Sequence, residues 1–136
     1  GEIDPAPALA ALAARGAVIV WPRVTARAPR LRFLRSSRLA SGAYGIAEPP
    51  RDAPEVPLEA IDVFLVPGVA FDGRGARLGW GGGVYDEIGA RIRRQARGFL
   101  LGVAHERQIV KRCPAGPGDV FVHAVATDAR LVRAVT

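Results

Sequence analysis

Residues 77–86, with the sequence RLGWGGGVYD, bring several glycines together with charged and aromatic side chains. Glycines at 79, 81, 82 and 83 let a backbone approach an anion closely and turn its N–H groups toward it. Arg77 can add a charge-assisted hydrogen bond to a phosphate oxygen. Asp86 can hold a hydrated Mg²⁺ ion that bridges phosphates, or can simply cap a helix. These residue types therefore predict a phosphate-binding loop.

General nucleotide-binding motifs match this segment only in part. The segment lacks the Gly-Lys-Ser/Thr ending of a P-loop, and Val84 stands where the dinucleotide pattern has its third glycine. On these residues alone, a flexible connector between a strand and a helix remains the alternative interpretation.

The elements on both sides of the segment have clear patterns. Residues 61–67 form a near-continuous apolar run, as expected for a strand of a parallel sheet covered on both faces. A helix is predicted over about residues 85–96, and another buried strand over residues 99–104. The buried stripe of the helix is expected to contain Val84, Ile88 and Ile92. Residues 61–104 thus predict a right-handed β-loop-α-β unit, with the glycines beyond the carboxyl end of its first strand.

The first sixteen residues predict a helix with recognisable ends. Asp4 is expected to cap it, Pro5 to take its first position and Gly16 to end it.

The remaining elements complete an α/β pattern. Short strands are predicted at residues 18–21, 31–33 and 124–127, and the Pro- and Gly-rich residues 36–57 predict a loop. We therefore expect a single domain over residues 1–136, with a three-layer α/β/α, mostly parallel and Rossmann-like architecture.

Composition narrows the class of protein. No apolar run is long enough to cross a bilayer, and the chain is expected to be a cytoplasmic monomer without membrane partners. The one cysteine, Cys113, excludes an internal disulfide, and His105 and His123 lie too far apart for a recognisable zinc motif. The net charge of +6 suits small anions such as nucleoside triphosphates. Nucleic acid is not the expected partner, because no block of like charges is present and only 7% of the residues are aromatic.

A longer segment around the glycine motif makes the functional prediction more specific. VFLVPGVAFDGRGARLGWGGGVYDEI, at residues 63–88, closely resembles the signature of the 5-formyltetrahydrofolate cyclo-ligase (methenyltetrahydrofolate synthetase) family. EID, VIVWPRV, LRF and GIAEP upstream, and LLGVAHERQIV and GPGDVFVHAVATD downstream, also resemble family segments in family order. The resemblance covers essentially the whole chain.

The resemblance implies an ATP-dependent ring closure. The formyl oxygen of 5-formyltetrahydrofolate attacks the γ-phosphoryl group of ATP, and N10 then closes onto the activated carbon. The products are 5,10-methenyltetrahydrofolate, ADP and phosphate. By position, ATP would contact Arg77, Gly79, Gly81, Gly82, Gly83 and Tyr85; the folate would contact Glu2, Trp80, Gly82 and Val84; and Asp86 would hold Mg²⁺. The resemblance assigns no acid or base catalyst.

Three departures from the family pattern keep an alternative open. An N-terminal segment with phosphate-binding cations is expected to be missing, Val84 replaces a tyrosine, and His123 replaces an aspartate near the metal. The alternative is a non-catalytic cyclo-ligase-like module that binds a nucleotide or RNA. A sugar-phosphate enzyme on a similar scaffold has no support outside the glycine loop.

Overall fold

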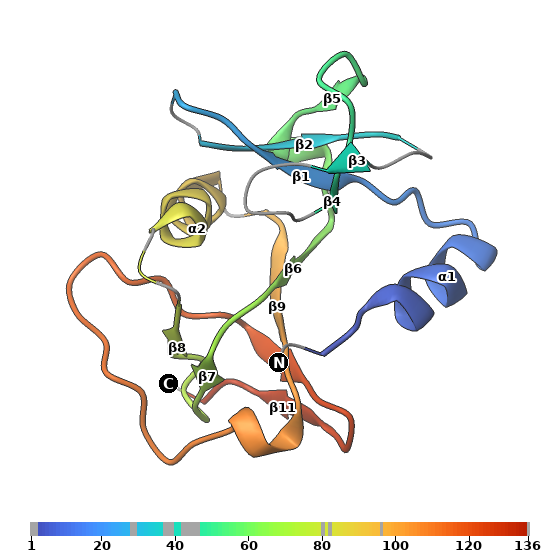
Figure 1. The fold of residues 1–136 in the computed structure, drawn as a ribbon. Helices are drawn as coiled ribbons and strands as arrows, with labels where there is room; N and C mark the ends of the chain where they lie inside the picture. Colours follow the sequence, from blue (N-terminus) through green and yellow to red (C-terminus); the bar gives the residue numbers. More distant parts are fainter. Residues whose placement is uncertain are drawn as a thin grey trace. The chain divides into compact units, whose positions relative to one another are not determined.

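The computed structural model describes residues 3–27, 30–36, 40–41, 47–79, 81, 83–95 and 97–135. The chain forms two compact units. Residues 5–61 make up the N-terminal unit, and residues 62–136 with residues 1–4 make up the C-terminal unit (Figure 1). The single domain expected from the chain length stays a prediction. No helix among the described residues is long and apolar enough to span a membrane.

The N-terminal unit contains one helix and small antiparallel sheets. Strand β2 pairs with β1 on one side and with β5 on the other, both antiparallel, and β3 pairs with β4. In chain order its elements are α1 (Ala6–Ala14), β1 (Trp21–Val24), β2 (Leu31–Leu34), β3 (Ala40–Ser41), β4 (Ala47–Glu48), β5 (Glu55–Val56) and the 3-10 helix η2 (Leu58–Ala60).

Several expectations for this unit are corrected. The first helix is present and Gly16 follows it at φ +94°, but Pro5 rather than Asp4 occupies the N-cap position. The buried strand expected at residues 18–21 is wrong: β1 starts only at Trp21, and Val18 is 59% exposed. Strand β1 lies at the end of the order β1-β2-β5, and such an end tolerates a proline that lacks an N–H group.

The loop expected at residues 36–57 is also corrected in part. It contains the three short strands β3, β4 and β5. The many prolines and glycines of this segment had predicted a loop instead. The strand expected at residues 31–33 is confirmed as β2.

The C-terminal unit is built around a mixed sheet in the order β11-β10-β9-β6. The pairs β6–β9 and β9–β10 are parallel, whereas β10–β11 is antiparallel. A hairpin of β7 and β8 follows β6. In chain order the elements are β6 (Val63–Val66), β7 (Ala70–Phe71), β8 (Arg77–Leu78), α2 (Val84–Gln95), β9 (Phe99–Val103), the 3-10 helix η3 (Glu106–Gln108), β10 (Ala124–Ala126) and β11 (Leu131–Arg133).

The predicted β-loop-α-β unit is confirmed as β6, α2 and β9, with the two strands parallel. Ile88 and Ile92 are buried as expected, while Val84 is only half-buried. The β7–β8 hairpin and β11 were not expected. The fold is α/β with mixed sheets, and the three-layer, mostly parallel architecture stays a prediction.

The core of this unit depends on close contact between a phenylalanine and glycine backbone. Phe71 is fully buried, and Gly102 of β9 lies directly against its ring. A Cβ atom at Gly102 would lie 2.6 Å from Cε1 of Phe71, which is closer than van der Waals contact allows.

We therefore expect Gly102→Ala to lower the free energy of unfolding by about 1–3 kcal/mol, as overpacked cores usually do. The measurement is urea unfolding of both proteins. Gly116→Ala is the matched control, because a Cβ atom there meets nothing within 4 Å. Equal losses in the two variants would contradict the tight packing of Phe71 against β9.

Candidate active site

The carboxyl end of β6 and the start of α2 are joined by the side chain of Arg77. The β7–β8 hairpin places Arg77 opposite Phe71. Its Nη1 donates a hydrogen bond of 3.0 Å to the carbonyl oxygen of Pro67, the residue after β6. The guanidinium carbon lies 5.6 Å from the centre of the Tyr85 ring in the first turn of α2. A cation over an aromatic face is held by the ring's negative potential.

Arg77 is well shielded from water. Its side chain is 8% exposed, and its Nη2 lies 3.9 Å from Oδ1 of Asp86. This ion pair is at the limit of direct contact, so the hydrogen bond to Pro67 and the Tyr85 ring do more to fix the guanidinium. The arrangement leaves a positive charge at the point where the glycine segment meets the helix.

Asp86 has one engaged oxygen atom. Its Oδ1 accepts a hydrogen bond of 3.3 Å from the N–H of Val120 and faces Arg77. Oδ2 has no hydrogen bond to the residues that the structure describes, and the side chain is 31% exposed. The N-cap role considered for Asp86 is not seen, since the residue lies inside α2.

The glycine segment approaches Arg77 closely. A Cβ atom at Gly79 would lie 2.8 Å from Nη1 of Arg77, so a larger residue would push the guanidinium aside. Gly81 and Gly83 have φ values of +100° and +70°, which side chains other than glycine rarely adopt. Of the other expected site residues, Glu2, Trp80 and Gly82 lie outside the described residues.

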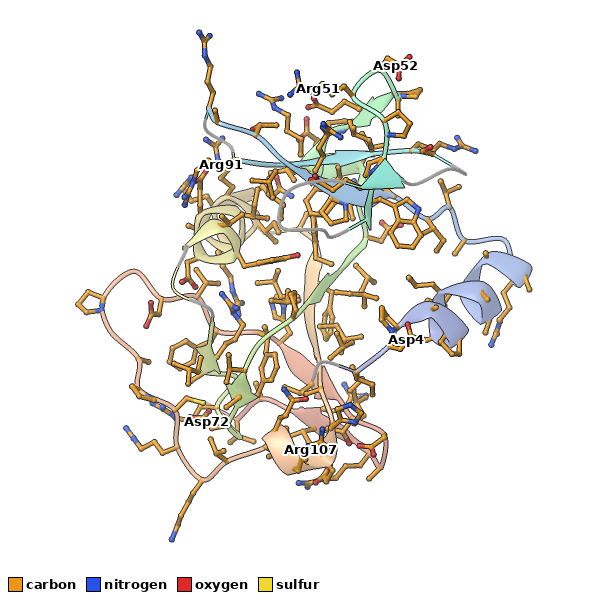
Figure 2. The ribbon with its side chains drawn as sticks, in the orientation of Figure 1. Asp4, Arg51, Asp52, Asp72, Arg91 and Arg107 are labelled. Atoms are coloured by element: carbon orange, nitrogen blue, oxygen red, sulfur yellow. The ribbon has the colours of Figure 1, made fainter. Side chains whose placement is uncertain are left out.

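Asp72 is a buried carboxylate that sequence reasoning left without a role. It is 1% exposed, and Figure 2 shows its place beside the hairpin. Its Oδ1 accepts from the N–H groups of Arg74 and Ala76 at 2.8 and 3.1 Å. Its Oδ2 accepts from Nη2 of Arg74 and from the N–H of Cys113, both at 2.8 Å.

The environment of Asp72 favours its ionised form. Burial alone would raise the pKa of Asp72, but the hydrogen bonds from Cys113, Arg74 and Ala76 outweigh burial and lower it. The sequence Asp-Gly-Arg-Gly at residues 72–75 could have indicated this turn, because an aspartate side chain commonly accepts a hydrogen bond from the backbone N–H two residues further on.

Gln108 is a second positioning residue that the sequence did not reveal. Its Nε2 donates to the carbonyl oxygens of Gly68 and Val69, both at 3.1 Å. Its Oε1 accepts from the N–H of His105 at 2.8 Å, which closes a capping box around η3. The turn that leaves β6 is thereby tied to the turn that leaves β9.

His123, at the position where the family resemblance has an aspartate, is held in a structural environment. Its ring stacks on Phe99 with centroids 4.8 Å apart, and its Nδ1 accepts from the N–H of Leu100 at 2.9 Å. Nη1 of Arg93 lies 2.8 Å from Nε2. Burial, together with the positive charge of Arg93, lowers the pKa of His123. The ring is therefore neutral at physiological pH.

No protein-only metal cage exists in the described part of the chain. Within these residues, no three His, Cys, Asp or Glu side chains lie close enough together to hold a metal ion. This does not argue against a nucleotide-bound Mg²⁺ ion, because Mg²⁺ is usually held by one or two carboxylates with phosphate and water oxygens. Asp86 is half-buried, and its Oδ2, which has no hydrogen bond among the described residues, fits such a ligand set.

Comparison with known proteins decides the family. The profile of the 5-formyltetrahydrofolate cyclo-ligase family matches residues 1–128. The chain belongs to this family. The resemblance carried by residues 63–88 is therefore confirmed, and the family assignment favours the cyclo-ligase interpretation over that of a non-catalytic binding module.

Individual cyclo-ligases align with most of the chain. The 5-formyltetrahydrofolate cyclo-ligase of Escherichia coli K12 is 34% identical over 136 residues, covering 96% of this chain and 74% of that protein. The cyclo-ligase of Mycolicibacterium smegmatis is 36% identical over 104 residues, covering 74% of this chain and 52% of its own length. The solution structure of Aquifex aeolicus 5,10-methenyltetrahydrofolate synthetase superposes with a TM-score of 0.75 at 32% identity, over 98% of this chain and 66% of that chain.

Removing the negative charge of Asp72 should destabilise the folded protein. We expect Asp72→Asn to lower the free energy of unfolding at pH 7 by about 3 kcal/mol, because it leaves buried donors without a charged acceptor. The matched control is Asp62→Asn, whose side chain is 84% exposed beside Arg97 and should change stability by less than about 1 kcal/mol.

The stability difference between the parent protein and Asp72→Asn should depend on pH. The folded-state pKa of Asp72 lies below its ordinary value of 3.8, so its stabilisation is complete above that value. The stabilisation is lost as the pH falls through the lower, folded-state pKa. The difference in unfolding free energy between the parent and Asp72→Asn should therefore shrink below about pH 3.8, as followed by urea titrations at several pH values. A constant difference down to pH 2 would contradict it.

Proposed function

We propose that this chain carries the site of an ATP-dependent conversion of 5-formyltetrahydrofolate to 5,10-methenyltetrahydrofolate, with release of ADP and phosphate. Membership of the cyclo-ligase family supports the reaction. The observation that carries the proposal is the guanidinium of Arg77, held between the Pro67 carbonyl and the Tyr85 ring at the glycine segment.

Phosphoryl transfer needs positioning and charge neutralisation rather than a complicated set of covalent catalysts. The start of α2 contributes the positive end of a helix dipole. Arg77 contributes a fixed positive charge, the backbone at Gly81 is open, and Gly79 lets that backbone pass close to the Arg77 guanidinium. We assign ATP contacts to these residues, to Gly82, Gly83 and Tyr85. The γ-phosphoryl group would thus be oriented for attack by the formyl oxygen.

Asp86 is the residue proposed to hold the metal ion. Its Oδ2 is open for a Mg²⁺ ion, whose remaining ligands would be phosphate oxygens and water. When bound, the ion would supply charge neutralisation between the phosphates. Asp86 itself would orient the ion at the start of α2, within the field of Arg77.

The folate contacts remain assigned by family position. They comprise Glu2, Trp80, Gly82 and Val84, of which only Val84 is described, as a half-buried residue opening α2. The three-layer architecture, the cytoplasmic location, the monomeric state and the absence of membrane or nucleic-acid partners likewise stay proposals.

A test of the metal role compares two neighbouring carboxylates. Asp86→Asn should lower turnover with Mg-ATP by about 100-fold, because the amide binds Mg²⁺ far more weakly. Raised Mg²⁺ concentration should restore part of the activity. The readout is the near-ultraviolet absorbance of the methenyl product, and Glu87→Gln is the control in the same helical turn. Similar activities in both variants would remove Asp86 from the metal site.

A second test concerns the guanidinium of Arg77. Arg77→Lys keeps the charge but loses the planar group that spans Pro67, Tyr85 and the phosphates, so ATP affinity should fall about tenfold. Isothermal titration calorimetry with a non-hydrolysable ATP analogue in the presence of Mg²⁺ measures this affinity. Arg91→Lys, the same substitution on α2 away from the glycine segment, should leave the affinity unchanged. An equal effect of both substitutions would argue against a direct contact.

A further inference from the structure

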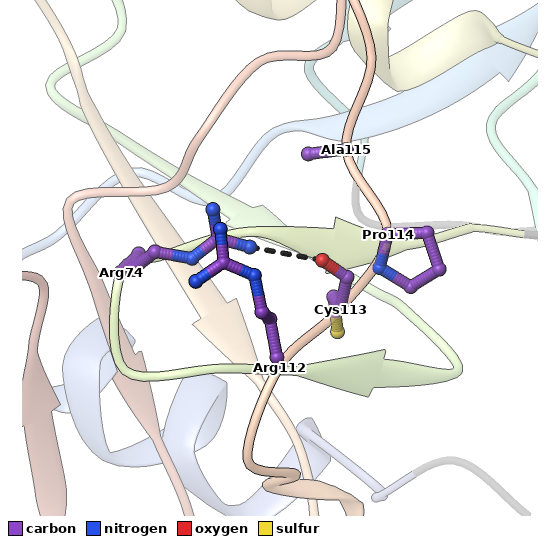
Figure 3. Close-up of a pocket in the computed structure, with 5 residues that line it drawn as sticks. All are labelled: Arg74, Arg112, Cys113, Pro114 and Ala115. Carbon is purple, nitrogen blue, oxygen red and sulfur yellow. Dashed lines mark hydrogen bonds between the residues drawn. The ribbon is translucent and has the colours of Figure 1, made fainter.

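A second cationic pocket lies at the turn of the β7–β8 hairpin. It has a volume of about 390 Å³ and is lined by Arg74, Arg112, Cys113, Pro114 and Ala115 (Figure 3). Such a volume accommodates a small ligand. None of its lining residues belongs to the set assigned to ATP, the metal ion or the folate.

Arg74 is fixed in this pocket before any ligand arrives. Its Nη2 donates to Oδ2 of Asp72 and to the carbonyl oxygen of Cys113, at 2.8 and 2.9 Å. Its Nε lies 3.2 Å from the same carboxylate oxygen, and its guanidinium lies 5.4 Å from the centre of the Phe121 ring. Nη1 has no hydrogen bond to the described residues. One edge of the guanidinium is therefore oriented and still available.

Arg112 supplies a charge that the described residues do not balance. It is exposed, and within the described ranges no residue forms a hydrogen bond or an ion pair with it. The charge of Arg74 is matched by Asp72, whereas that of Arg112 has no such partner among the residues that the structure describes. Two guanidinium groups that share one pocket repel each other, and an anion between them would remove this repulsion.

We propose that this pocket binds a phosphate group. Guanidinium groups recognise phosphate through paired N–H donors. Several phosphate oxygens point in different directions, so one group can meet Nη1 of Arg74 and the guanidinium of Arg112 together. A carboxylate has only two acceptor oxygens and a single negative charge, so it neutralises two guanidinium groups less completely than a phosphate does.

The pocket is separate from the glycine segment along the chain. Residues 72–76 form the turn at one end of the hairpin, and Gly79 leaves from the other end, after β8. Arg74 and Arg77 therefore serve different ends of one hairpin. Binding at the turn does not require ATP chemistry, so it can be tested without the proposed reaction.

The first experiment is titration calorimetry with inorganic phosphate at constant ionic strength. Arg112→Gln should weaken binding about tenfold, whereas Lys111→Gln, the same charge change on the neighbouring residue, should alter it less than about twofold. Arg112 is exposed, so its substitution should leave the fold intact. Absence of saturable phosphate binding, or equal weakening in both variants, overturns the proposal.

The second experiment locates the bound group and identifies its source. Phosphate should shift the ¹⁵N resonance of the Arg112 Nε in NMR spectra, whether or not that of Arg77 also shifts; a shift of Arg77 without one of Arg112 overturns the proposal. Glycerol phosphate that competes with phosphate would extend the site to phosphate esters, whereas failure to compete would restrict it to the free ion. Either result supports a phosphate site. Glutarate that competes as well as phosphate would instead indicate a general anion site and overturn the assignment.

Discussion

The ionised carboxylate of Asp72 holds together the segment on which the candidate active site depends. It is buried, and a buried carboxylate is tolerated only when its oxygens are filled by donors. Those donors come from the turn after β7 and from the N–H of Cys113, forty-one residues further along the chain. The turn, the hairpin and the Cys113 segment therefore have one mutually compatible arrangement. Losing the charge would loosen all three together.

The effect of this constraint on the site passes through Arg77, the residue after Ala76. Because the N–H of Ala76 donates a hydrogen bond to Asp72, the backbone that enters β8 is fixed. Arg77 therefore reaches Pro67 and Tyr85 from a defined position. Gln108 fixes the other side of this arrangement by holding the turn after β6. A pre-positioned cation loses little side-chain entropy when a phosphate binds, which is how a site of few residues can be effective.

Local patterns explain which parts of the fold were predictable from the sequence. The apolar runs predicted the strands β6, β9 and β10, and the periodic stripe through Ile88 and Ile92 predicted α2; the structure confirms these elements, although Val63 and Phe99 are exposed. The two-residue strands of the hairpin are too short to carry any periodicity. The roles of Asp72 and Gln108 depend on partners about forty residues away, and sequence spacing does not reveal such pairs. The strand expected at residues 18–21 was misplaced because a proline was taken to end a strand, whereas β1 runs through Pro22 to Val24.

The pairing of Arg77 with Asp86 suggests how the free protein prepares for a charged substrate. At 3.9 Å the pair is a weak interaction, yet each charge lowers the electrostatic cost of holding the other beside a buried strand end. Binding of ATP with Mg²⁺ would exchange partners: the guanidinium would turn to phosphate and the carboxylate to the metal ion. Both residues would then have charged partners throughout, and the site would not be left with an isolated, poorly hydrated charge. On this argument, ATP without Mg²⁺ would bring its negative charge against an unneutralised Asp86, and nucleotide and metal should bind cooperatively.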